Sequence, residues 1–466
     1  MAVLMAGTFV FVLDFFVVNV AIPATQADLG ASSGEIQLVV ATYAIAIASL
    51  LIVGGRLGDL FGRRRLFVAG LALFTVASAL CGAAPSIEVL LAGRAVQGIG
   101  AALFAPQVLS IISVSFDGPA RRQAVTVYGL VMGLAAVSGQ LIGGALIELD
   151  LLGLGWRACY LVNVPVGIAA LAVAPRALAE SRAERGERLD VPGAALAGAT
   201  LVALVLPLIE GRPEGWPLWT FASLAAAAPL GAAFVLRQRH LAAAGASPLV
   251  DPTLFRERAF AVGVVASIVF YAGMASFFLV LAVYLQEGCG LGALDSGLVF
   301  TALAAGYLAA SLAAEALAPR FGRQVLAAGG VVRAVALVGL AMTVAAIGTG
   351  GSPWLLVPAL AVDGIGMGLL TAPLVATVVG GMEERHAGAA SGVLSTAQQV
   401  GNTIGVAAIG AVFYGAIGPN ADFAAAFEIA LLCVAAVSLA VAALVQALPA
   451  PRSATDETAA ATPAAA

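Results

Sequence analysis

The chain carries one short segment twice: GDLFGRRRLFVAG at residues 58–70 returns as APRFGRQVLAAGG at residues 318–330. Two further pairs of copies follow in the same order: AVQGIGAAL at 95–103 with AVDGIGMGL at 361–369, and GQLIGG at 139–144 with GNTIGV at 401–406. The three pairs are offset by 260, 266 and 262 residues. Such regular spacing predicts two equivalent halves that arose by duplication.

The composition places most of the chain in lipid. Apolar residues make up 61% of the 466 residues and charged residues 10%, and the mean hydropathy is +1.04. A soluble protein needs more polar surface than this. We therefore expect an all-α polytopic membrane protein, in which a spanning helix needs about 20 apolar residues. Fourteen stretches qualify: 2–23, 38–57, 66–84, 88–113, 124–147, 158–176, 191–209, 218–236, 259–285, 293–316, 325–348, 354–379, 390–416 and 424–447.

The positions of the arginines predict the orientation. All 22 basic residues are arginine; with a cytoplasmic N-terminus, 18 lie in inner connections, Arg157 and Arg212 in outer ones, and Arg94 and Arg333 within helices. This distribution satisfies the positive-inside rule. We therefore expect a plasma-membrane (inner-membrane) protein with both termini cytoplasmic and no removable signal peptide. The charges fit 12 helices as well as 14, but the length and apolarity of 191–236 predict that this pair spans.

The repeat and the helix count together predict the domains. Residues 1–180 and 255–448 form two six-helix bundles, residues 190–237 form an inserted transmembrane hairpin, and the Ala/Pro/Thr-rich residues 449–466 form a disordered tail. Repeated halves around a midplane cavity are the architecture of alternating access.

Several motifs resemble those of one transporter family. GRLGDLFGRRRL at 55–66 resembles the signature loop of the major facilitator superfamily, and LDFFVVNVAIP at 13–23 resembles the first-helix motif of its 14-helix drug:proton antiporter (multidrug efflux) branch. The segments RAVQGIG at 94–100, WRACYLVNVPVG at 156–167 and LFRERAF at 254–260 are also similar to that branch. The resemblance implies the major facilitator fold and export of small hydrophobic or cationic compounds by proton antiport.

The fifth-helix motif departs from the pattern of this branch. Gln140 stands where the branch has a proline. Because proline is a common cause of kinks, we expect this helix to be less kinked than in the family.

Three buried charges are candidates for proton coupling: Asp14, Arg94 and Asp363. A charged carboxylate at the bilayer centre costs about 2.5–3.5 kcal/mol, so it must be paired, neutral or beside water. Helix geometry places Arg94 within about 6 Å of Asp14 along the membrane normal. The resemblance implies proton coupling for Arg94. Alternatives are a permanently paired structural Asp14, a snorkelling Arg94, and an Asp363 that holds its helix to a neighbour.

The remaining candidates are polar cavity residues, a gating loop and a glycine stripe. For the substrate cavity we expect Asn19, Gln97, Tyr43, Tyr271, Gln398 and Asn402. For the gating loop we expect Gly55, Gly58, Asp59, Gly62 and Arg63, and the resemblance implies that Asp59 faces the helix start near Ala387–Ser391, a contact worth about 0.3–2 kcal/mol. Glu315 is expected to pair with Arg320 or Arg323. For close helix packing on the fifth helix we expect Gly129, Gly133, Gly139, Gly143 and Gly144.

Other function classes find little support. Because the chain has no lysine, it has no Walker A phosphate loop, which excludes an ATP-driven pump built on one chain. His240 and His386 lie in polar connections, and the four cysteines lack metal-ligand spacing. We expect no cofactor, no metal, no nucleic-acid partner and a monomer that exchanges protons and a small molecule across the bilayer. A uniporter or proton symporter of a metabolite remains the alternative, and a membrane-embedded enzyme or a channel is more distant.

Cysteine labelling tests the predicted hairpin. A single cysteine at Gly215, in a background without native cysteines, should react with an impermeant maleimide added from outside the cell. Reaction only from the cytoplasmic side would show that 191–236 does not cross the membrane.

Overall fold

The computed structural model describes residues 1–182, 190–211, 214–246, 248–380, 384–417 and 421–448, which form helices and short connections without a strand. Thirteen helices are long and apolar enough to span a membrane, or fourteen if the bent α5 is one span, and both helices of the expected hairpin are among them. The expected all-α polytopic fold is confirmed. The helices are α1 Ala2–Leu29, α2 Ser33–Phe61, α3 Arg63–Gly82, α4 Ile87–Ser115, α5 Gly118–Leu149, α6 Ala158–Leu161, α7 Asn163–Ala177, α8 Val191–Glu210, α9 Leu218–Ala243, α10 Arg258–Val283, α11 Ala293–Phe321, α12 Arg323–Ile347, α13 Val357–Gly380, α14 Glu384–Ile417 and α15 Phe423–Leu444.

The repeated segment contains a glycine because its tight turn has a positive φ angle. Gly62 joins α2 to α3 with φ 111°, and Gly322 joins α11 to α12 with φ 53°. Residues other than glycine rarely adopt these φ angles. The two copies of the motif therefore build the same helix–turn–helix connection.

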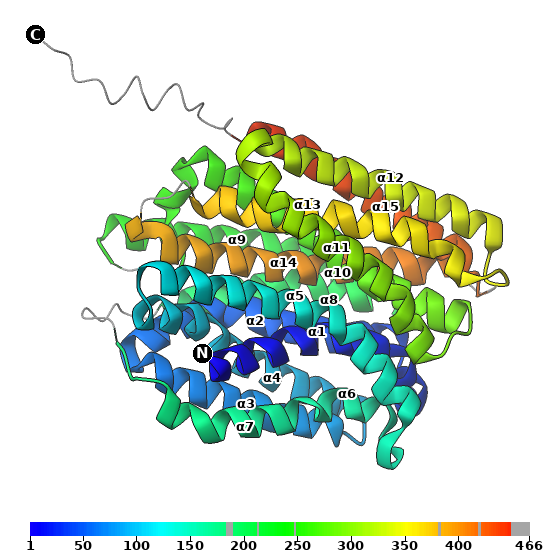
Figure 1. The fold of residues 1–466 in the computed structure, drawn as a ribbon, viewed down its shortest axis with the longest axis horizontal. Helices are drawn as coiled ribbons and strands as arrows, with labels where there is room; N and C mark the ends of the chain where they lie inside the picture. Colours follow the sequence, from blue (N-terminus) through cyan, green and yellow to red (C-terminus); the bar gives the residue numbers. More distant parts are fainter. Residues whose placement is uncertain (183–189, 212–213, 247, 381–383, 418–420, 449–466) are drawn as a thin grey trace, which may run out of the picture.

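The two halves of the chain pack in the same way (Figure 1). In the first bundle, helices α1–α7, α1 packs on α5 and α2 on α4; in the second bundle, helices α10–α15, α10 packs on α14 and α11 on α13. The bundles meet along two seams, α5 against α11 and α2 against α14.

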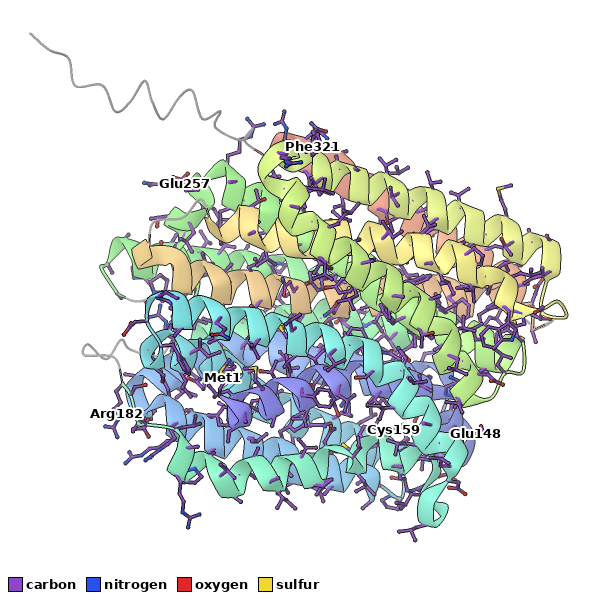
Figure 2. The ribbon with its side chains drawn as sticks, viewed as in Figure 1. Met1, Glu148, Cys159, Arg182, Glu257 and Phe321 are labelled. Carbon is purple, nitrogen blue, oxygen red and sulfur yellow. The ribbon has the colours of Figure 1, made fainter. Side chains whose placement is uncertain are left out.

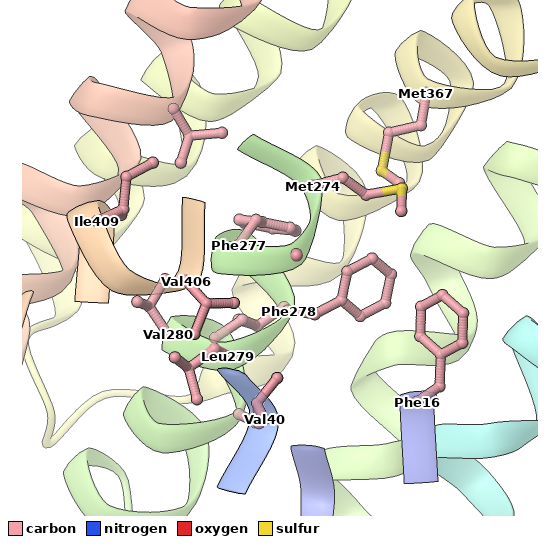
Figure 3. Packing of buried hydrophobic residues seen from close by; sticks show 14 of the residues in the cluster. Phe16, Val40, Met274, Phe277, Phe278, Leu279, Val280, Met367, Val406 and Ile409 are labelled. Carbon is pink, nitrogen blue, oxygen red and sulfur yellow. The ribbon is translucent and has the colours of Figure 1, made fainter. Parts of the chain in front are cut away.

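The helices run between two ends of the molecule. Figure 2 shows Met1 and Arg182 toward one end, here called the Met1 end, and Glu148 at the other, the Glu148 end. Toward the Glu148 end the bundles are in direct contact: Gln286 Nε2 donates to the Val20 carbonyl at 3.1 Å. Phe16 of α1 packs edge-on against Phe278 of α10, with ring centroids 5.0 Å apart (Figure 3). Phe278 also stacks on Phe300 of α11, with ring centroids 5.6 Å apart.

The fifth helix, α5, bends although Gln140 stands in place of the proline of the related motif. The segments Val127–Ala136 and Ser138–Leu149 of α5 meet at an angle of 41° without a proline at the bend. The Ser138 hydroxyl donates to the Leu134 carbonyl at 2.6 Å. Such bonds from serine to the preceding turn bend helices, and Gly139 follows directly.

The bend divides the expected glycine stripe. Gly139 and Gly143 pack against α1, and Gly144 packs against Ala293 of α11. A side chain added at Gly129 or Gly133 would meet no described atom within 4 Å. These two glycines therefore make no close helix contact among the described residues.

The hairpin α8–α9 lies against both bundles. Near the Glu148 end, Val205 and Ile209 of α8 pack with Ala41 of α2 and Ala407 of α14. Near the Met1 end, the hairpin is held by the Asp190 carboxylate.

Asp190 joins the hairpin to the segment that leads to α10. Its carboxylate accepts from Gly193 N–H at 2.9 Å, Arg237 Nε at 2.6 Å and Gln238 Nε2 at 2.8 Å, and Gln238 Oε1 accepts from Val250 N–H at 3.1 Å. Burial raises the pKa of Asp190, but the bonds from Gln238, Arg237 and Gly193 outweigh it and leave the pKa below its ordinary value. Asp190 therefore holds the hairpin as an anion.

Candidate functional site

The Asp14 carboxylate is fully buried and accepts three hydrogen bonds. Its Oδ2 accepts from Arg94 Nη1 at 2.7 Å, and its Oδ1 accepts from Gln97 Nε2 and Asn163 Nδ2, both at 2.8 Å. Asp14 is 0% exposed and Arg94 is 1% exposed. The two charges expected from the sequence to lie close together therefore form a direct, dry ion pair.

Arg94 is held by more than its carboxylate partner. Its Nε donates to the Val39 carbonyl of α2 at 3.0 Å, and its Nη1 also donates to Gln97 Oε1 at 2.7 Å. The guanidinium lies 4.0 Å from the centre of the Tyr43 ring, a cation–π contact. These contacts replace the water that the charge loses on burial.

Three members of this cluster were missed by sequence reasoning. Ser78 on α3 accepts from Gln97 Nε2 at 3.2 Å and from Asn163 Nδ2 at 3.1 Å, and it donates to the Tyr160 carbonyl at 2.8 Å. Asn163 and Tyr160 both lie in the segment WRACYLVNVPVG. A polar asparagine amid that apolar stretch was the available signal, whereas Ser78 gave none. With these residues the cluster joins α1, α2, α3, α4, α6 and α7.

The second bundle contains a separate buried ion pair. Arg333 Nε of α12 lies 3.3 Å from Asp363 Oδ1 of α13, and both residues are 0% exposed. Arg333 Nη2 also donates to the Gly273 carbonyl of α10 at 3.3 Å. Among the described residues, Arg333 Nη1 and Asp363 Oδ2 have no hydrogen-bond partner. Asp363 is thus not with Asp14 but in a looser pair within the other bundle.

Two residues expected in the substrate cavity belong instead to the Asp14 cluster. Tyr43 and Gln97 are both 0% exposed and contact Arg94. Asn19 is also buried and donates to the Phe15 carbonyl of its own helix at 2.9 Å. All three side chains thus make these contacts within the first bundle.

The other expected cavity residues lie in the second bundle. Tyr271 is half-buried on α10 beside Phe270, with ring centroids 5.2 Å apart. Gln398 and Asn402 lie on α14; Gln398 is half-buried, and Asn402 is buried and donates to Gln399 Oε1 at 3.0 Å.

An ion pair within the gating loop and a hydrogen bond to Glu180 hold the loop in place. Arg63 Nη2 lies 2.8 Å from Asp59 Oδ1, and Arg64 N–H donates to Glu180 Oε1 at 3.1 Å. Gly58 packs against the Gln107 side chain of α4, whereas Gly55 meets only Pro106. The side chains of Glu315 and of 387–389 and 391 lie outside the described residues, so the Asp59 contact and the Glu315 pair stay predictions.

A double-mutant cycle tests the buried pair. Arg94→Met leaves the Asp14 charge buried without its cation and should destabilise the protein by about 3–5 kcal/mol. Adding Asp14→Asn removes that charge and should restore part of the loss, which thermal unfolding in detergent can measure.

The surface pair Arg157–Asp28, at 2.6 Å with side chains 29% and 48% exposed, is the matched control. Arg157→Met should cost about 1 kcal/mol or less. Additive effects of Arg94→Met and Asp14→Asn would contradict a coupled buried pair.

The chain is similar to a known protein family in sequence and to a solved structure in fold. The family model described as Major Facilitator Superfamily matches residues 4–406 and 263–466. A solved structure titled as a POT family transporter in complex with a thioalcohol conjugated peptide superposes with a TM-score of 0.68 over 96% of this chain and 95% of its own. At 12% identity, that likeness supports the fold alone.

Curated relatives match at higher identity. The probable actinorhodin transporter of Streptomyces coelicolor is 38% identical over 90% of this chain and 73% of its own length. The cephamycin export protein CmcT of Amycolatopsis lactamdurans is 36% identical over 95% and 90%, and the puromycin resistance protein pur8 of Streptomyces alboniger is 35% identical over 89% and 82%. The chain is therefore a multi-pass membrane protein that belongs to the major facilitator superfamily.

Proposed function

We propose that this protein exports small hydrophobic or cationic compounds in exchange for protons. The named relatives export or confer resistance to antibiotics, which supports drug efflux. The observation that carries the proposal is the dry Asp14–Arg94 pair, because buried ionisable groups in membrane helices are generally functional. In this proposal the protein is a non-enzymatic monomer of the plasma membrane with both termini cytoplasmic.

Asp14 is the proposed proton carrier. A proton on Asp14 removes the negative charge that Arg94 Nη1, Gln97 Nε2 and Asn163 Nδ2 hold. A neutral carboxyl cannot hold these donors as strongly. Protonation therefore loosens α1 from α4 and α7.

The helix that carries Asp14, α1, also contacts the other bundle. Phe16 lies two residues after Asp14 and packs against Phe278 of α10. Residues two apart point to nearly opposite sides of a helix, so α1 faces the ion pair on one side and the second bundle on the other. A shift of α1 upon protonation therefore alters the contact between the bundles.

The energy available is sufficient for export. One charge that crosses the membrane gains about 2.3 kcal/mol per 100 mV. A tenfold gradient of a neutral compound needs about 1.4 kcal/mol. One proton per cycle therefore drives accumulation by well over tenfold.

Two further residues have proposed roles in the cycle. Asp363, whose Oδ2 has no partner among the described residues, is the second candidate for a proton or a cationic substrate, although its pair with Arg333 also ties α13 to α12. Asp59 is the proposed latch between the gating loop and the start of α14.

Substrate-driven proton release tests the assignment of Asp14. Addition of puromycin to purified protein in weakly buffered detergent should release protons from the wild type between pH 6 and 9. Asp14→Asn cannot carry the proton and should release none, while Asp363→Asn should retain release. Wild-type stoichiometry in Asp14→Asn would move the carrier elsewhere, with Asp363 the next candidate.

A further inference from the structure

Gln140 on α5 is a buried amide without a partner. Its side chain is 1% exposed, and neither Nε2 nor Oε1 meets a hydrogen-bond partner among the described residues. Most buried polar groups in proteins are paired, so an exception needs an explanation. No role in the Asp14 cluster accounts for it.

Asn402 occupies the same place in the second bundle. The repeat aligns GQLIGG with GNTIGV, which pairs Gln140 with Asn402. The preceding glycines pack in equivalent ways, Gly139 against α1 and Gly401 against α10. Asn402 is 5% exposed, and its Oδ1 also has no partner among the described residues.

Both amides belong to helices that form a seam between the bundles, Gln140 to α5 and Asn402 to α14. The backbone carbonyl of Gln140 lies against Gly297 of α11, where a Cβ added to the glycine would be 2.7 Å from it. One turn after Asn402, Val406 belongs to the same apolar cluster as Val40 of α2, shown in Figure 3. In alternating access these seams part and re-form. Each amide is therefore buried while its seam is closed and becomes accessible when it parts.

We propose that Gln140 and Asn402 bind the substrate when the seams part, and that they select uncharged compounds carrying hydroxyl and carbonyl oxygens. A primary amide both donates and accepts hydrogen bonds and has no charge. It therefore fits a neutral partner that can do both. This inference rests on the proposed export function, whose substrate class it narrows.

The unpaired amides also give such a substrate a way to change the conformation. A ligand shifts an equilibrium only through its different affinities for the two states. With the seams closed, both polar atoms of the Gln140 amide and Asn402 Oδ1 have no partner among the described residues, and a hydroxylated ligand would give them one. A ligand of the same shape without the hydroxyl group lacks this difference.

Two probes that differ by one hydroxyl group test the proposal: 7-hydroxyflavone and flavone, at pH 6, with the full chain in nanodiscs. Binding is followed by quenching of tryptophan fluorescence. The wild type should bind 7-hydroxyflavone about 5–10-fold more tightly, the effect of one hydrogen bond. In Gln140→Met, and likewise in Asn402→Leu, the ratio of the two dissociation constants should fall toward one.

Gln107→Met is the matched control. Gln107 is a buried amide on α4 whose Nε2 donates to the Gly54 carbonyl at 2.8 Å. Its loss should lower the Tm and leave the binding ratio unchanged. Gln140→Met should instead raise the Tm, because it removes unpaired polar atoms.

Two results would overturn the inference: a wild type without preference for 7-hydroxyflavone, or a Gln140→Met variant that keeps the wild-type ratio, whatever its Tm. Proton-coupled puromycin export, measured with the same preparations in vesicles, reports on the proposed function separately. If puromycin export persists but the protein shows no preference for 7-hydroxyflavone, only this inference is contradicted. If both the export and the preference are absent, the proposed function is contradicted.

Discussion

The Arg94–Asp14 ion pair is the interaction on which the first bundle depends. Neither residue is more than 1% exposed, so water does not compensate either charge. Each therefore needs protein partners, and these come from α1, α2, α4 and α7. A buried pair of this kind is weak evidence for stability as such, because desolvation offsets most of the attraction. In the proposed function, its value is to link the position of α1 to a single proton.

The second bundle repeats the architecture but not the charge pattern. The residue equivalent to Gln97 is Asp363, and its arginine comes from α12 rather than from its own helix. The pair there is longer, at 3.3 Å, and leaves a polar atom unpaired on each partner among the described residues. The first bundle thus holds a tight charge cluster and the second a looser ion pair.

Much of the fold could be predicted from the sequence because hydropathy and the repeat act along the chain. Apolar length predicted the spans, and the positive-φ glycines Gly62 and Gly322 explain why the repeated turn is recognisable. The pairing of Asp14 with Arg94 could be predicted from helix depth alone. The contributions of Ser78 and Asn163 to the cluster could not be predicted, because they come from other helices whose rotation the sequence does not specify. The bend of α5 was missed because a serine bond, not a proline, accompanies it.

In the proposed cycle, the charge state of Asp14 controls how the two bundles meet. Spin labels at Leu152 and Gly350, both exposed at the Glu148 end in connections of different bundles, measure this directly by double electron–electron resonance. The account predicts two distance populations in the wild type whose ratio changes between pH 5.5 and 8.5. Asp14→Asn should show the low-pH population at every pH. A pH-dependent shift in Asp14→Asn equal to that of the wild type would contradict the account.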